Sequence, residues 1–112
     1  MLTDRKSLLK SVITYDSFFA DSLSTLNKFK WDSPGIVVLN TIDVISILRR
    51  FLANELSGKQ VEEWANAIES REDIDYKDED KIKEVIFDLA NPSITYPLSF
   101  SKAKEIIASL GE

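Results

Sequence analysis

The stretch from Leu56 to Tyr76, LSGKQVEEWANAIESREDIDY, decides the fold of this chain. It opens on a capping box, in which the Ser57 hydroxyl accepts from the Gln60 N–H and the Gln60 side chain returns to the Ser57 N–H. Leu56 before the cap and Val61 after it are placed as a hydrophobic staple. The apolar residues then recur at helical spacing: Val61, Trp64, Ala65 and Ile68. These signals predict an amphipathic helix that buries one face.

Trp64 has two interpretations at this stage. Tryptophan is enriched at the centres of protein interfaces, so Trp64 is a candidate binding hot spot. Its place in the middle of the apolar stripe instead favours burial in the core. The helical spacing makes the core interpretation the stronger of the two.

Two groups of apolar residues precede this helix at the N-terminus. The first group shares one helical face and follows a cap at Thr3 or Asp4: Leu8, Leu9, Val12 and Ile13. Asp16 or Ser17 can start a second stripe, which consists of Phe18, Phe19, Leu23, Leu26 and Phe29. Two serines are expected on its outer side, Ser22 and Ser24. The pattern allows one bent helix or two, and the β-branched and aromatic run Ile13–Tyr15 favours two.

The middle of the chain is divided by WDSPG at residues 31–35, where the Pro-Gly pair favours a turn. The next segment, Ile36–Leu39, has strand propensity, but no second run of that kind is present to pair with it. It is expected to be an extended segment on the core or the beginning of the next helix. Asn40 is placed to cap a helix that ends near Asn54, with Asp43 in its first turn. The buried face of that helix is predicted to contain Ile42, Val44, Ile45, Leu48, Phe51 and Leu52.

A polar loop is expected after the Trp64 helix, over residues 70–76, with Ile74 and Tyr76 turned inward. Asp78 or a neighbour can cap another helix. The apolar face of that helix is formed by Ile82, Val85, Ile86, Leu89 and Ala90. The Asn-Pro pair at residues 91–92 ends it.

The C-terminal part consists of a linker, residues 93–98, and a last helix that Ser99 caps and Gly111 closes. Its apolar residues are Ala103, Ile106, Ile107 and Leu110. The sum is five or six short helices joined by short loops. The sequence therefore predicts an all-α, single-domain bundle over residues 1–112.

Composition and charge narrow the possible functions. A chain of 112 residues with 44% hydrophobic and 29% charged residues is an ordinary globular domain. The net charge is −5 and is unevenly distributed. Residues 1–54 have five acids and seven bases, whereas residues 55–88 have twelve acids and five bases. Such an acidic region disfavours nucleic acid and favours basic protein partners, or else serves solubility.

The usual catalytic and metal-binding motifs are absent. The chain has no cysteine and no histidine, which excludes thiolate chemistry, histidine-supported nucleophiles and the common zinc sites. A calcium loop starting at Asp73 would have Asp75 and Glu84 in register, but Lys77 replaces a ligand and Asp78 replaces the required glycine. The sequence predicts no catalytic residue, no metal site and no cofactor, and therefore a protein that is not an enzyme.

The remaining candidate site is the acidic segment. Its predicted partner-binding residues are Glu62, Glu69, Glu72, Asp73, Asp75, Tyr76, Asp78, Glu79 and Asp80. Like charges at helical spacing repel each other by roughly 0.2–0.5 kcal/mol per pair. Lysines nearby or a cationic partner must compensate for this repulsion. A partner would use the carboxylates for steering and Tyr76 as an aromatic anchor.

Four segments of the chain resemble the small helical immunity proteins that bacteria make against their own nuclease toxins. They are ILRRFL at residues 47–52, LS at 56–57, VEEWAN at 61–66 and VIFDLANP at 85–92. The family includes colicin immunity proteins and the partners of contact-dependent growth inhibition toxins. The resemblance implies an acidic surface that blocks a basic nuclease active site or an adjacent exosite. It transfers no individual binding residue, because these surfaces vary with the toxin.

The expected function is that of an immunity protein that neutralises a cognate nuclease toxin. We expect no nucleic-acid or membrane partner, and a monomer, with a homodimer as the other possibility. The alternative is a helical adaptor or regulatory module with an apolar interface, and a carboxylate enzyme or metal binder is a third option. The first 19 residues lack the apolar region of a signal peptide, and the longest apolar run, Ile36–Leu39, has four residues. A cytoplasmic location is therefore expected.

Overall fold

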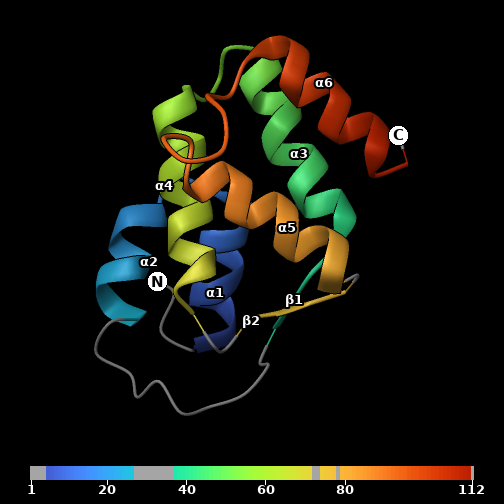
Figure 1. Ribbon diagram of the computed structural model, residues 1–112. Coiled ribbons are helices and arrows are strands. Elements are labelled where there is room, and N and C mark those ends of the chain that lie inside the picture. The colour runs from blue at the N-terminus through green and yellow to red at the C-terminus, as the bar shows by residue number, and fades with distance from the viewer. Residues whose placement is uncertain (1–4, 27–36, 72–73, 78, 112) are drawn as a thin grey trace.

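Six helices and a small sheet make up the part of the chain that the computed structural model describes (Figure 1), which is residues 5–26, 37–71, 74–77 and 79–111. In chain order the elements are α1 (Arg5–Thr14), α2 (Phe19–Leu26), β1 (Val37–Leu39), α3 (Thr41–Leu52), α4 (Gly58–Glu69), β2 (Ile74–Tyr76), α5 (Glu79–Ala90) and α6 (Phe100–Ser109). The prediction of an all-α bundle is confirmed, with a two-stranded sheet in addition. Several predictions fall outside the described residues: those for Thr3, Asp4, Phe29, residues 31–35 and Ile36.

The helix α4 begins at the predicted capping box. The Gln60 N–H donates to Ser57 Oγ at 3.1 Å, and the Ser57 N–H donates to Gln60 Oε1 at 2.8 Å. Trp64 is fully buried, and its indole N–H donates to the carbonyl oxygen of Ile13 at 2.8 Å. This bond ties the middle of α4 to the end of α1. The core interpretation of Trp64 is confirmed.

One hydrophobic cluster contains side chains from all six described helices and both strands. Within it α4 packs most extensively on α5, α3 packs on α6, and α1 packs on α2. Figure 1 shows α4 on the left of the bundle, α1 and α2 at the lower left, α3 and α6 at the upper right, and α5 crossing in front. Because α4 packs on α1, α3 and α5, it joins the N-terminal helices to the later ones.

The N-terminal residues form two helices, as expected, and the break between them lies at Tyr15, which has a left-handed backbone with φ 49°. The predicted outward position of Ser22 is wrong, because its side chain is buried. Ser22 Oγ donates to Ser11 Oγ at 3.0 Å, and Ser11 Oγ donates to Asp16 Oδ1 at 2.6 Å. The hydroxyl is satisfied inside the α1–α2 interface, which removes the cost of burying it.

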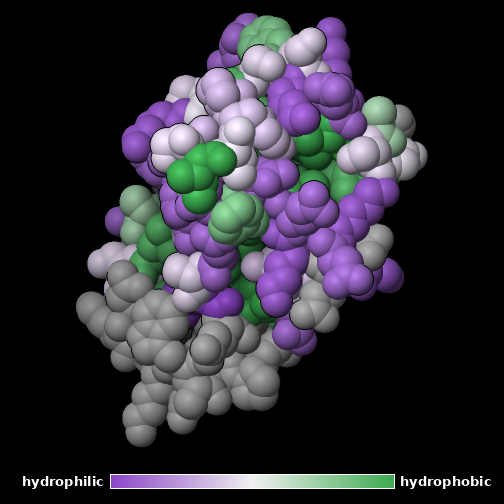
Figure 2. Space-filling model, in the orientation of Figure 1, coloured by the Kyte–Doolittle hydropathy of each residue, from purple (hydrophilic) through white to green (hydrophobic). Residues whose placement is uncertain are grey.

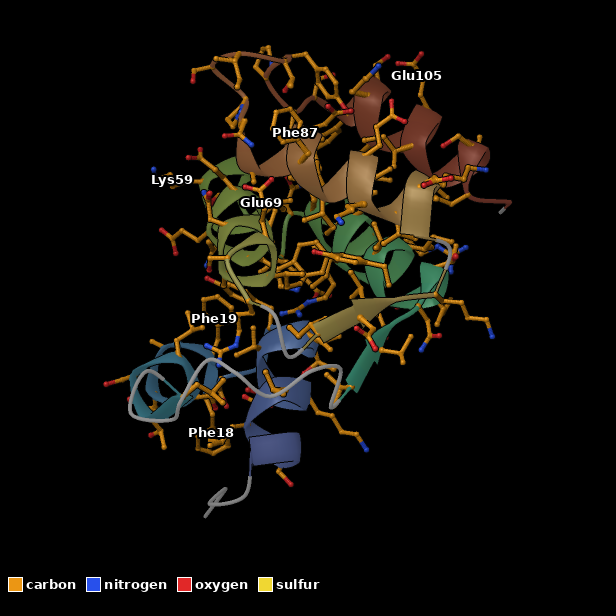
Figure 3. The ribbon with its side chains drawn as sticks, turned by 60° about the horizontal axis from the view of Figure 1, so that its bottom comes forward. Phe18, Phe19, Lys59, Glu69, Phe87 and Glu105 are labelled. Atoms are coloured by element: carbon orange, nitrogen blue, oxygen red, sulfur yellow. The ribbon has the colours of Figure 1, made fainter. Side chains whose placement is uncertain are left out.

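Two side chains that were predicted to be buried are exposed. Phe18 is 56% exposed because it lies before the first turn of α2, whereas the neighbouring Phe19 is buried. Figure 3 shows the two rings pointing in different directions. Ile42 is 53% exposed because it shares a face of α3 with Ser46 and Arg49, both of which face solvent.

The sheet corrects the prediction of a loop over residues 70–76. The strands β1 and β2 are parallel, with the register Val37↔Ile74, Val38↔Asp75 and Leu39↔Tyr76. In β2 the side chains alternate, since Ile74 is buried, Asp75 is exposed and Tyr76 is half-buried. The inward positions of Ile74 and Tyr76 were predicted correctly. Of the two forms expected for the segment that became β1, the extended one is present. The pairing was missed because three residues with a central aspartate do not resemble a strand.

The end of α3 and both ends of α6 follow the predicted signals, whereas the predicted cap at Asp78 lies outside the described residues. Asn54 has a left-handed backbone with φ 64° just after α3, and Gly111 does so with φ 98° after α6. At the start of α6, the Lys102 N–H donates to Ser99 Oγ at 3.1 Å. In the described part of the chain, no helix has both the length and the apolar character needed to cross a bilayer.

The capping box gives a direct test of how α4 starts. Replacing Ser57 with alanine removes the acceptor for the Gln60 N–H, and we expect a loss of about 1 kcal/mol in the free energy of unfolding. Urea denaturation followed by circular dichroism measures it. The exposed Ser101 within α6 supplies the control, because Ser101→Ala should change stability by less than about 0.5 kcal/mol. Equal effects at the two serines would contradict the capping role.

The Trp64 hydrogen bond gives a larger effect. Trp64→Phe leaves a cavity and an unpaired Ile13 carbonyl, so we expect a loss of about 2–4 kcal/mol in the same urea experiment. Phe18→Ala is the matched control, since it removes an aromatic ring that is already exposed and should cost about 0.5 kcal/mol or less. A Trp64→Phe variant as stable as the wild type would show that α1 and α4 are held together by other contacts.

Candidate functional site

The predicted acidic site is divided by the fold. Glu69 at the end of α4, Asp75 in β2 and Asp80 in the first turn of α5 are exposed and follow one another in the chain from the end of α4 through β2 to the start of α5. We call these three residues the acidic edge. Glu62 lies about two helical turns before Glu69 on α4, which is roughly 10 Å along the helix axis. Four predicted members have no described side chain: Glu72, Asp73, Asp78 and Glu79.

The carboxylates of the acidic edge face solvent. Within the part of the chain that the structure describes, none of Glu69, Asp75 and Asp80 forms a salt bridge. Tyr76 is half-buried beside them, and burial, followed by the charge of Glu69, raises the pKa of its hydroxyl. Glu69 is thus close enough to Tyr76 for its charge to be felt there. Figure 3 shows the position of Glu69 on α4.

Glu62 belongs to a different feature, a cleft of about 240 Å³. It lies between the first turns of α4, the end of α5 and residues 92–98. The apolar part of its wall contains Val61, Leu89, Pro92, Pro97 and Leu98, and its polar side chains are Glu62, Asp88 and Tyr96. We call it the Tyr96 cleft. It combines a small apolar enclosure with two carboxylates that come from different helices.

The pKa of Tyr96 reflects the negative electrostatic potential in this cleft. Its hydroxyl donates to Asp88 Oδ2 at 3.2 Å. Burial and the charge of Asp88, together with the more distant Glu84 and Glu105, raise the pKa of Tyr96 to about 12. The ammonium of Lys102 lies 4.4 Å from the centre of the Tyr96 ring and 3.9 Å from Glu105 Oε2. Among the described residues that act on this ring, the acids Glu84, Asp88 and Glu105 outnumber the one base, Lys102.

Hydrogen bonds hold the segment that follows α5 against the end of this helix. The wall that this segment contributes to the cleft therefore has a fixed position. Thr95 Oγ1 lies 3.0 Å from the carbonyl oxygen of Asp88 and 2.9 Å from that of Asn91. The Asn91 side-chain amide donates to the Phe87 carbonyl oxygen at 2.9 Å. These bonds satisfy carbonyl groups at the end of α5 that the helix itself leaves unpaired.

Apolar side chains are exposed close to this wall. Phe87 in the last turns of α5 is 45% exposed, and Ile94 in the following turn is 71% exposed. Figure 2 shows green apolar atoms surrounded by purple hydrophilic ones over the end of α5 and the turn after it. An apolar centre with a polar surround is the usual composition of a protein interface.

Sequence reasoning found Glu62 but missed Asp88 and Tyr96. Asp88 was included only in the segment 85–92 that carries the resemblance, and Tyr96 lay in a segment assigned only as a linker. One signal in the sequence could have indicated Asp88. It is a charged residue between the apolar Phe87 and Leu89, and if α4 and α5 pack together it faces the N-terminal turns of α4. Among the described residues, no group of three or more acids is arranged to hold a metal ion.

Comparisons with protein-family models, with curated proteins and with solved structures find no match to this chain. Its function is therefore inferred from its own residues and their arrangement.

The raised pKa of Tyr96 predicts a pH dependence. Unfolded tyrosine loses its proton near pH 10, whereas folded Tyr96 keeps it until about pH 12, so the folded state binds more protons in this window. Stability should therefore fall as the pH rises from 10 to 12, and Tyr96→Phe should remove that part of the fall. The measurement is the urea midpoint of both proteins at pH 8.5 and pH 11. A decrease of the same size in both would contradict the assignment.

Proposed function

We propose that this protein is a cytoplasmic immunity protein of the colicin or contact-dependent growth inhibition type. It binds a basic nuclease toxin as a stoichiometric inhibitor through its acidic surface. The observation that carries the proposal is the acidic edge, whose three carboxylates in α4, β2 and α5 are exposed and have no salt-bridge partner among the described residues. The resemblance of residues 47–66 and 85–92 to small immunity proteins agrees with it.

The electrostatics of such a surface suit a basic partner. A nuclease binds phosphates with basic residues, so its active site and exosites attract a cluster of carboxylates. Complementary charge mainly raises the association rate, and it disfavours acidic competitors. The acidic residues would then raise the association rate and set the orientation of the partner, while apolar contacts would provide the binding affinity.

Apolar side chains accompany both the acidic edge and the Tyr96 cleft. Tyr76 is half-buried beside Glu69, and Phe87 and Ile94 are exposed near the Tyr96 cleft. Aromatic side chains with carboxylates around them are the composition expected of an interface in which a few residues provide most of the binding energy.

A second candidate, a helical adaptor that forms homodimers, is favoured by a different observation. Val38 in β1 and Ile42 in α3 are 47% and 53% exposed and lie close together in the chain. An apolar dimer interface there would withstand salt. Light scattering at low and high salt separates the candidates, because the immunity protein is expected to be a monomer in both.

Co-expression with the product of the gene immediately upstream tests the proposal. A one-to-one complex and protection of the cells from that product are expected. Reversal of the acidic edge with Glu69→Lys, Asp75→Lys and Asp80→Lys together should slow association by roughly tenfold or more and reduce its salt dependence. Stopped-flow mixing at 50 and 300 mM salt measures both effects.

The matched control carries the same change in net charge at exposed acids outside the acidic edge and the Tyr96 cleft, namely Asp21→Lys, Glu55→Lys and Glu63→Lys. It should change the association rate less than the edge variant does. Equal effects of the two triple variants would mean that net charge alone controls binding. The proposal fails if no complex forms and the cells gain no protection.

A further inference from the structure

The Tyr96 cleft has a composition that the acidic edge lacks. Its two carboxylates, Glu62 and Asp88, come from separate helices and share one opening with apolar walls. Its volume of about 240 Å³ lies below the range of roughly 300–1,000 Å³ that small-molecule pockets occupy. The cleft therefore matches one inserted side chain better than a whole small-molecule ligand.

We propose that the Tyr96 cleft receives one arginine side chain of the protein partner, whose guanidinium is bound by Glu62 and Asp88. This inference rests on the proposed function, since it specifies what the partner inserts into the surface. In this proposal the acidic edge attracts the partner over long range, and the Tyr96 cleft at the α4–α5 junction binds one of its side chains directly.

The charges of the cleft favour a cation. Glu62 and Asp88 both line it, and Glu84 and Glu105 lie near enough to act on Tyr96. Among the described residues, Lys59 pairs with Glu62 at 3.7 Å, and the side chains of Lys59 and Glu62 are 72% and 28% exposed. A long pair whose ammonium remains in solvent contributes little, so an incoming cation can displace that ammonium at small cost.

The carboxylates retain free acceptor positions. Asp88 Oδ2 accepts from the Tyr96 hydroxyl, but a carboxylate has about four lone-pair sites, so both oxygens can accept again. The Lys59 ammonium, at 3.7 Å from Glu62 Oε2, is beyond the ordinary distance of a charge-assisted hydrogen bond. Two carboxylates with unused acceptor capacity thus share one opening.

Arginine fits this arrangement better than lysine does. Its planar guanidinium carries five donors in a fixed geometry and can bridge two carboxylates, whereas an ammonium acts as a compact point charge. The weakly hydrated guanidinium also tolerates contact with a tyrosine ring and with apolar walls. Val61, Leu89 and Leu98 provide contacts for the methylene groups of the arginine stem.

Titration with N-acetyl-L-arginine amide, followed by two-dimensional ¹H–¹⁵N NMR of the full chain, tests the cleft without the partner. Binding in the millimolar range is expected, with the largest shifts at residues 58–62 and 88–98. N-acetyl-L-citrulline amide has the same shape without the charge, and the lysine analogue has the charge without the planar group. Both should bind several-fold more weakly.

Variants assign the interaction to the two carboxylates. Glu62→Gln and Asp88→Asn should each weaken binding of the arginine amide by about tenfold, the loss expected for one charge-assisted contact. Glu63→Gln is the matched control, because it makes the same charge change one residue along α4 outside the cleft, and it should alter binding less than twofold. If the NMR spectrum shows that Asp88→Asn disturbs the fold, the comparison of Glu62→Gln with Glu63→Gln tests the site alone.

The outcomes separate this inference from the proposed function. Equal binding of the arginine and citrulline amides, shifts outside the cleft, or equal losses for Glu62→Gln and Glu63→Gln would overturn the arginine site. The toxin complex and its dependence on the acidic edge could still stand. Arginine-specific binding in a chain that forms no complex with the upstream product would support the site and refute the immunity function.

Discussion

The hydrogen bond from the Trp64 indole to the Ile13 carbonyl is the constraint on which the arrangement of the helices depends. A buried indole N–H must find an acceptor, and the last turn of a helix supplies carbonyl groups without partners of their own. The same helix end receives Arg50 from α3, which donates to the carbonyl oxygens of Thr14 and Tyr15 at 2.8 and 3.0 Å. Three consecutive carbonyls at the end of α1 are thus satisfied by α3 and α4.

This shared end explains why α1 must stop where it does. A continuous helix through Tyr15 would use the carbonyls of Ile13 and Thr14 within itself and leave Trp64 without an acceptor. The left-handed backbone of Tyr15 ends the helix instead, and the positive charge of Arg50 suits the negative end of the α1 dipole. With α4 held at its middle, its first turns meet α5 at the Tyr96 cleft and its last turn leads into β2.

Local signals in the sequence were sufficient to predict the helices, but they were insufficient to predict the candidate site. The Ser57–Gln60 box, the Ser99 cap and Gly111 act within four residues, so spacing alone identifies them. The β1–β2 pairing joins residues about 37 positions apart, and the Ser22–Ser11 bond joins separate helices, so neither has a local signature. The acidic segment was found by composition, but its division between the acidic edge and the Tyr96 cleft follows from the crossing of α4 and α5.

The fold and the proposed binding surface use different residues. Trp64, Ile68 and Ile86 are fully buried and hold the bundle together, whereas Glu69, Asp75 and Asp80 face solvent and add little to its stability. Surface charges can change sign or position while the core packing stays the same. An inhibitor of the proposed kind would need such a separation, because each new partner would then require new surface residues and no new core. The exception is the Tyr96 cleft, whose walls come from the core-forming helices, so its shape is fixed by the same packing that forms the bundle.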